Sequence, residues 1–144
     1  MAERRARTTW QGDLASGSGT TEFDSGAIPP QQVSWSARIE EPGGKTSPEE
    51  LIAGAHSTCI SMALAHGLSS AGTPPTKLTT DAVCTFGQLD EGFGITSMRL
   101  TVRGVVDGLD DAGFKAAVEQ AAANCPVSKA LAGNVDISVD AALE

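Results

Sequence analysis

The stretch that decides the fold is SPEELIAGAHSTCISMALAHGLSSAGTPPT, residues 47–76, which carries no Asp, Glu, Lys or Arg after Glu50. It opens with a strong helix start. Ser47 suits the N-cap, Pro48 suits the first helical position, and Glu50 stands where a capping box needs an acid. Gly72 and the prolines that follow it end the pattern. We therefore expect one long helix over most of this stretch.

A charge-free helix of this length raises a membrane-spanning alternative. The segment is nevertheless small and weakly polar on nearly all sides, since two histidines and several serines and threonines interrupt its apolar residues. Such a composition favours a helix buried in protein, either centrally or between subunits. We expect no membrane association.

Strands are predicted on the N-terminal side of this helix. Residues 6–40 hold short apolar stretches broken by turn residues such as Gly17, Gly19 and Pro30. Within them Val33, Trp35, Ala37 and Ile39 alternate at period two, and the alternation predicts a strand over residues 33–39. The region is interpreted as a β-meander.

On the C-terminal side, residues 78–86 and 98–106 alternate around a turn at 90–92, which predicts an antiparallel pair with one wet face. An amphipathic helix is expected over 110–124, then a short helix after Cys125 and a last strand over 135–143. This order of elements predicts an α+β fold, as a single domain over residues 1–144.

Composition narrows the function further. The formal net charge of −8 disfavours nucleic acid and anionic membranes as partners, and the cluster Arg4, Arg5 and Arg7 is interpreted as a solvated tail. Those arginines have no apolar stretch behind them, so no secretory signal is expected. An odd number of cysteines, three, argues against a secreted disulfide framework. We expect a cytoplasmic protein.

The three cysteines differ in context. Cys59 lies in the middle of the long helix, where spacing alone favours a small core residue. Cys125 precedes Pro126 at a helix start, where unsatisfied backbone N–H groups lower a thiol pKa. Cys84 shares an apolar strand face and is interpreted as a core residue.

A reactive Cys59 would need a nearby cation. Lowering a thiol pKa from about 8.5 to about 6 takes roughly 3.4 kcal/mol. The helix dipole fades within one turn, whereas a unit charge at about 4 Å contributes on the order of 4 kcal/mol at an effective dielectric of 20. His56 and Arg38 are the candidates, although Arg38 also fits an ordinary surface arginine. The residues alone leave open whether Cys59 and Cys125 meet.

Three motifs carry a family resemblance: WQGDL (10–14), SPEELIAGAHSTCISMAL (47–64) and NCPVSKAL (124–131). With their spacing, they resemble the osmotically inducible protein C branch of the OsmC/Ohr hydroperoxide reductases over nearly the whole chain. The resemblance implies antiparallel sheets packed around a long central helix in an intertwined homodimer. It also implies Cys59 as peroxidatic cysteine and Cys125 as resolving cysteine, with Arg38 activating and Glu49 as its partner.

The activity implied by the resemblance is reduction of organic hydroperoxides, with hydrogen peroxide reduced less well. Cys59 would become a sulfenic acid, Cys125 would resolve it as a disulfide, and an external dithiol or thiol would reduce that disulfide. No metal or organic cofactor is expected. The sequence departs from the family at Ser57 and Thr58, where alanines are common.

Helix geometry constrains the place of Glu49. Ten residues separate it from Cys59, about 15 Å of helix rise, so Glu49 cannot reach Cys59 within its own helix. If Glu49 orients the arginine at the thiolate, Glu49 of one subunit should approach Cys59 of the other. We therefore expect an obligate dimer with composite sites.

Two rival functions remain at this point. His56 and Cys59 share a helix face and Cys125 could join them in a metal site, although no C-x-x-C pair is present. Alternatively, the chain is a non-catalytic ligand-binding or stress protein on the same fold, with ordinary thiols.

Overall fold

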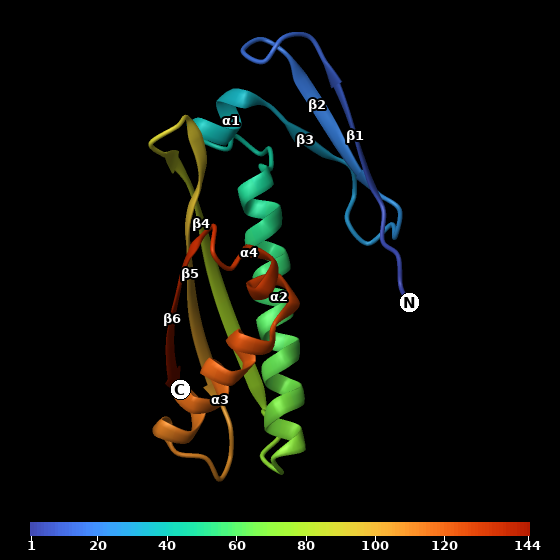
Figure 1. Cartoon of the computed structure of the whole chain (residues 1–144). Helices are drawn as coiled ribbons and strands as arrows, with labels where there is room; N and C mark the ends of the chain where they lie inside the picture. The colour runs from blue at the N-terminus through green and yellow to red at the C-terminus, as the bar shows by residue number, and fades with distance from the viewer. The chain divides into compact units, whose positions relative to one another are not determined.

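The computed structural model describes residues 1–144 and has six strands and four helices (Figure 1). Along the chain three strands, two helices, two strands, two helices and one strand follow one another in groups, and the predicted α+β class is confirmed. The chain divides into two compact units, Met1–Leu51 and Ile52–Glu144. A single domain over the whole chain stays a prediction, and each unit is described separately below.

The first unit begins with a small antiparallel sheet in the order β1–β2–β3, formed by Ala6–Gln11, Ser18–Phe23 and Gln31–Val33. The predicted meander is therefore present. Gly19 is required at the second position of β2 because a Cβ there would lie 2.9 Å from Trp10 Cε3 and 3.0 Å from Val33 Cγ2. The indole of Trp10 thus occupies the space that a larger residue would need.

The predicted strand over residues 33–39 is wrong beyond Val33. The chain leaves β3 and forms a short helix, α1, over Trp35–Ile39. Ser34 is its N-cap and accepts a hydrogen bond from the backbone N–H of Ala37 at 3.3 Å. Because the apolar residues Trp35 and Ile39 are also four apart, the same sequence fits a helical turn, and the local cap decides between the two.

The long helix α2 spans Pro48–Ser70, as predicted. Ser47 Oγ accepts from the backbone N–H of Glu50 at 3.2 Å. The Glu50 carboxylate does not close the capping box onto Ser47 but accepts from Thr46 Oγ1 at 2.5 Å. At the other end Gly72 has a φ of 86°, which ends the helix in the left-handed region that glycine tolerates.

Only one stripe of α2 is buried within the chain. His56, Ile60, Leu64 and Leu68 recur every fourth residue and are at most 2% exposed. The opposite side is exposed and is made of Gly54, Ala55, Thr58, Met62, His66 and Ser69. By length and composition α2 is the one helix that could cross a bilayer, and 22% of its apolar window is buried. A buried core helix of a soluble protein meets the same criteria of length and composition. Burial of the exposed side of α2 therefore stays a prediction.

The second unit holds a sheet in the order β4–β5–β6, formed by Lys77–Gln88, Phe93–Val105 and Asp136–Leu143. The antiparallel β4–β5 pair confirms the prediction. However, β6 pairs with β5 in parallel, so this sheet is mixed. Parallel strands need a crossover connection, and α3 (Asp111–Asn124) and α4 (Pro126–Leu131) provide it.

Figure 1 shows α2, α3 and α4 packed on one face of this sheet. Their shared core is fully enclosed and includes Ile60 and Leu64 of α2, Met98, Leu100 and Val102 of β5, and Phe114 and Val118 of α3. Burial of each large apolar side chain contributes about 1.5–3 kcal/mol. This core fixes α2 against the start of α4, and so fixes Cys59 relative to Cys125.

Candidate active site

Cys59 and Cys125, 66 residues apart in the sequence, meet in the second unit. Their Sγ atoms lie 2.6 Å apart, and both residues are thiols. A disulfide bond is about 2.05 Å long, so joining the two sulfurs requires little movement. Cys125 is fully enclosed at the N-cap of α4, whereas Cys59, in the middle of α2, is partly exposed. Cys59 is therefore the thiol that a reagent from solvent meets first.

The surroundings of the pair favour ionisation of Cys125 over Cys59. Burial and the hydrogen bond with Cys125 raise the pKa of the Cys59 thiol, and the backbone N–H of Val127 offsets only part of this. Burial also acts to raise the pKa of Cys125. The adjacent Cys59 thiol, and the backbone and hydroxyl of Ser128, outweigh burial and leave that pKa lowered. A thiolate on Cys59 thus needs a charge from outside the pair.

Arg38 and Glu49 meet in the first unit. Arg38 Nη2 lies 2.7 Å from Glu49 Oε1, and Arg38 Nε lies 3.2 Å from both carboxylate oxygens. Glu49 is nearly enclosed, and it stands in the first turn of α2, where the helix dipole favours a negative charge. Both residues belong to one chain, so the carboxylate orients the guanidinium intramolecularly.

Arg38 also borders an apolar pocket of about 380 Å³ in the first unit. Trp35 lies one turn before it in α1, and the guanidinium carbon is 6.0 Å from the centroid of the Trp35 ring. The pocket lining is mainly apolar and consists of Thr8, Trp10, Leu14, Thr21, Val33, Ser34, Trp35, Arg38, Pro48 and Leu51. A charged group therefore stands beside a space suited to hydrocarbon.

The four predicted site residues thus form two pairs, one in each unit. Cys84 belongs to neither pair and packs on the core of the second unit, as expected for a core residue. Nor does the rival metal site form, since no three His, Cys, Asp or Glu side chains are grouped to hold an ion. His56, a candidate in that rival, instead bonds to Ser128, at 2.8 Å.

The role of Ser128 was not predicted from the sequence. One signal could have indicated it: Ser128 stands three residues after Cys125, where a side chain reaches back to its N-cap residue. The packing of Trp35 beside Arg38 was also missed, because residues 33–39 were expected to be extended.

The chain is similar to known proteins over most of its length. The family model described as OsmC-like protein matches residues 41–140. Peroxiredoxin OsmC of Escherichia coli is 37% identical over 134 residues, 93% of each chain. The organic hydroperoxide resistance protein of Xanthomonas axonopodis pv. citri is 32% identical over 98 residues, 67% of each chain.

Solved structures support the same fold. An organic hydroperoxide resistance protein from Elizabethkingia anophelis superposes with a TM-score of 0.80 at 24% identity, covering 100% of this chain and 98% of that one. OhrB of Bacillus subtilis gives a TM-score of 0.76 at 25% identity, covering 95% and 97%.

Fold and site together define an α+β protein with a partly exposed thiol in contact with an enclosed one. The chain belongs to the OsmC-like protein family.

Proposed function

We propose that this protein is a thiol peroxidase that reduces organic hydroperoxides to alcohols. The observation that carries the proposal is the contact of Cys59 with Cys125, at 2.6 Å between sulfurs. Two relatives that bear the names peroxiredoxin and organic hydroperoxide resistance protein support a peroxide-related redox role. The partly exposed Cys59 is the peroxidatic residue and the enclosed Cys125 is the resolving one.

The reaction has three steps. The Cys59 thiolate attacks the distal oxygen of the hydroperoxide, the O–O bond breaks, and the alkoxide takes up a proton and leaves as the alcohol. The sulfenic acid on Cys59 then condenses with Cys125, forming a disulfide and releasing water. An external dithiol or thiol reduces the disulfide by exchange and restores both thiols.

Arg38 supplies the positive charge that the cysteine pair lacks. Burial raises the pKa of Cys59, and a guanidinium within about 4 Å would offset that effect by roughly 4 kcal/mol at an effective dielectric of 20. Glu49 holds this guanidinium in a bidentate ion pair and so limits the directions in which it can point. The same charge stabilises the oxygen that develops negative charge during attack.

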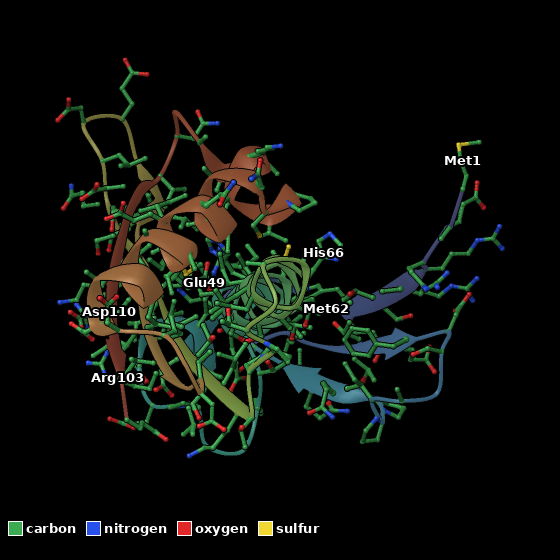
Figure 2. All side chains as sticks on the ribbon, turned by 90° about the horizontal axis from the view of Figure 1, so that it is seen from below. Met1, Glu49, Met62, His66, Arg103 and Asp110 are labelled. Atoms are coloured by element: carbon green, nitrogen blue, oxygen red, sulfur yellow. The ribbon has the colours of Figure 1, made fainter.

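We place this arginine at the Cys59 of a partner subunit in a homodimer. Glu49 and Cys59 are ten residues apart in α2, about 15 Å of helix rise, and Arg38 is bound to Glu49. The exposed side of α2 supports the dimer because it carries no charged residue from Gly54 to Ser69 and includes Met62, 69% exposed. Figure 2 shows Met62 and His66 on the side of α2 away from the β4–β6 sheet.

The apolar pocket beside Arg38 supports organic hydroperoxides as substrates in preference to hydrogen peroxide. Its volume of about 380 Å³ accommodates an alkyl or aryl group, and its walls carry few polar atoms. Hydrogen peroxide has no group that would fill this space. The odd number of cysteines, three, supports a reducing cytoplasm as the compartment.

Hydroperoxide consumption in the presence of excess dithiol tests the proposal. The wild-type protein should consume cumene hydroperoxide catalytically, Cys59→Ser should not, and Cys84→Ser should retain the wild-type rate as the matched control. A non-catalytic protein on this fold would give equal, background consumption in all three.

A further inference from the structure

A buried hydrogen bond that the proposed peroxidase reaction does not use holds the first turn of α4 to α2. His56 of α2 is 0% exposed, and its Nε2 lies 2.8 Å from the Oγ atom of Ser128 in α4. His56 precedes Cys59 by one helical turn, and Ser128 follows Cys125 by three residues. Figure 1 shows α4 in front of the middle of α2. The bond thus joins the two elements that carry the cysteine pair.

This bond restricts α4 more closely than the apolar contacts of the helix do. Of the six residues of α4, only Ser128 is buried, whereas Val127 and Leu131 are partly buried against the core. Apolar contacts have no direction, but a hydrogen bond to an enclosed ring restricts both distance and angle. The backbone N–H of Lys129 donates to the carbonyl of Cys125 at 3.0 Å, so Ser128 and Cys125 belong to one helical turn. Fixing Ser128 therefore also fixes Cys125.

The stability of the core does not account for this polar pair. Nδ1 of His56 is buried and has no hydrogen-bond partner in the chain. A buried polar atom without a partner destabilises the folded state, and replacing both members of a buried hydrogen bond by apolar groups can be neutral or stabilising. The pair is better explained by the position that it imposes on α4 than by the stability that it adds.

The unpartnered Nδ1 also gives the direction of the bond. A proton on Nδ1 would be a buried N–H donor without an acceptor, which is rarer in proteins than a buried acceptor without a donor. Burial also lowers the pKa of His56, which favours the neutral ring. The ring therefore carries its proton on Nε2, and His56 donates to Ser128 Oγ.

We propose that His56 is a positioning residue for the resolving step: its bond to Ser128 fixes α4 against α2 and keeps the Cys125 sulfur within reach of the Cys59 sulfur. The two sulfurs are 2.6 Å apart and a disulfide is about 2.05 Å long, so the His56–Ser128 bond can persist while the disulfide forms.

This inference rests on the proposed resolving role of Cys125. In that step Cys125 loses its proton and its sulfur attacks the sulfur of the Cys59 sulfenic acid. The S–S bond forms, the S–O bond breaks, and the hydroxide that leaves combines with the proton from Cys125 to give water. His56 takes no part in the bond changes and acts only through the position of α4.

Equilibrium with glutathione measures how closely the two sulfurs are held, because it gives the effective concentration of one cysteine at the other. All proteins in this test carry Cys84→Ala, so that Cys59 and Cys125 are the only thiols. His56→Leu and Ser128→Ala each remove the bond between α2 and α4. His56→Gln keeps an N–H donor at a similar reach.

The matched control is Ser61→Ala. Ser61 stands two residues after Cys59 in α2, and its Oγ lies 2.9 Å from Thr80 Oγ1 in β4. This variant therefore removes a hydrogen bond that α2 makes close to Cys59 but that does not involve α4.

We expect the effective concentration to fall about tenfold in His56→Leu and in Ser128→Ala, because displacing reacting groups by about 1 Å is enough for such a loss. The disulfide is then reduced by a less reducing glutathione mixture. His56→Gln and Ser61→Ala should stay near the parent value. An unchanged value in both His56→Leu and Ser128→Ala would overturn the proposal, as would equal losses in Ser61→Ala or in His56→Gln.

The double variant His56→Leu, Ser128→Ala separates positioning from stability. It leaves neither member of the pair buried without its partner, so it should unfold at a denaturant concentration at least as high as either single variant. Its effective concentration should nevertheless stay as low as theirs, because both substitutions remove the same bond. Recovery of the effective concentration together with the stability would show that the bond only stabilises the core, and would contradict the proposal.

A single turnover gives a second readout. After one equivalent of cumene hydroperoxide, His56→Leu and Ser128→Ala should form the Cys59–Cys125 disulfide about tenfold more slowly, while Cys59 is oxidised at the wild-type rate. Unchanged disulfide formation in both variants contradicts the positioning role. Failure of the wild-type protein to oxidise Cys59 would refute the proposed function, and the glutathione equilibrium, which needs no hydroperoxide, would still decide the inference.

Thermal unfolding checks that each variant is folded. Should His56→Leu not fold, Ser128→Ala decides the question by the same equilibrium, because it keeps the imidazole and removes only the hydroxyl.

Discussion

The two active-site thiols differ in what surrounds their sulfur atoms. Burial acts to raise the pKa of Cys125, but its neighbours Cys59 and Ser128 outweigh burial and leave that pKa lowered. Cys59 is the more accessible thiol, yet burial and its bond with Cys125 raise its pKa. Cys59, which the proposed reaction oxidises first, is thus the thiol that needs a nearby positive charge in order to ionise. This difference is the reason for proposing Arg38 as the activating residue.

Replacement of Arg38 should therefore slow the first chemical step. Arg38→Met removes a charge worth up to about 4 kcal/mol at Cys59, so oxidation of Cys59 near neutral pH should fall by roughly two to three orders of magnitude. Glu49→Gln keeps the charge but loosens its orientation, and a loss of about tenfold is expected. Stopped-flow rates across pH check this, since Arg38→Met should recover at higher pH. A wild-type rate in Arg38→Met at neutral pH contradicts the assignment.

His56 should make stability depend on pH. Its folded pKa is lowered by burial, so between that pKa and about 6.5 the unfolded chain binds more protons. Stability is therefore full above about pH 6.5 and falls with decreasing pH, by at most about 1.4 kcal/mol per unit from this residue. His56→Gln should show a shallower dependence in denaturant titrations from pH 7 to 5. Parallel curves for the two proteins would show that His56 does not titrate in this way.

At the scale of elements, local signals predicted most of the fold. The charge-free run after Glu50 and Gly72 placed α2, and alternation placed β4, β5 and β6. The strand over 33–39 failed because four alternating apolar residues also fit one helical turn, and the Ser34 cap is a contact that periodicity does not contain. The parallel pairing of β6 was missed because register across a crossover depends on packing rather than on strand pattern.

Packing between elements gives a test of the second unit. Gly104 of β5 is buried against α3, and a Cβ there would lie 2.6 Å from Phe114 Cε2 and Cζ. Since Phe114 is fully enclosed and cannot withdraw, Gly104→Ala should destabilise the fold by about 1–3 kcal/mol. The matched control is Gly67→Ala in α2, which meets nothing within 4 Å and should be neutral or stabilising by up to about 1 kcal/mol. Denaturant unfolding compares the two, and equal stabilities would refute the close approach.

At the scale of the molecule, the site residues were predictable but their contacts were not. The family resemblance implied Cys59, Cys125, Arg38 and Glu49, but their separation in the sequence did not show which of them are in contact. The structure pairs Cys59 with Cys125 and Arg38 with Glu49, each within one unit. It also adds the His56–Ser128 bond between residues 72 positions apart, which no local pattern encodes. The proposed homodimer would bring the Arg38–Glu49 pair of one subunit to the cysteine pair of the other.

Mixed dimers test this composite arrangement. Cys59→Ser and Arg38→Met should each be inactive alone. Random pairing makes about half of the dimers mixed. If Arg38 of one subunit activates Cys59 of the other, each mixed dimer has one intact site of its two, so the sample should show about a quarter of wild-type activity. Co-expression of the two tagged variants and a hydroperoxide assay provide the measurement, with light scattering to establish the dimer mass. No recovery from verified mixed dimers would place Arg38 at the Cys59 of its own chain.

The most direct test of a peroxidase built on Cys59 and Cys125 is a single turnover read by mass spectrometry. The reduced protein receives one equivalent of cumene hydroperoxide, is quenched with an alkylating reagent, and is digested without reductant. We predict one equivalent of alcohol, a disulfide joining Cys59 to Cys125, and alkylated Cys84. In Cys125→Ser, Cys59 should instead reach the sulfinic acid when hydroperoxide is in excess. Unreduced hydroperoxide with all three cysteines alkylated, or a disulfide that involves Cys84, would contradict the account.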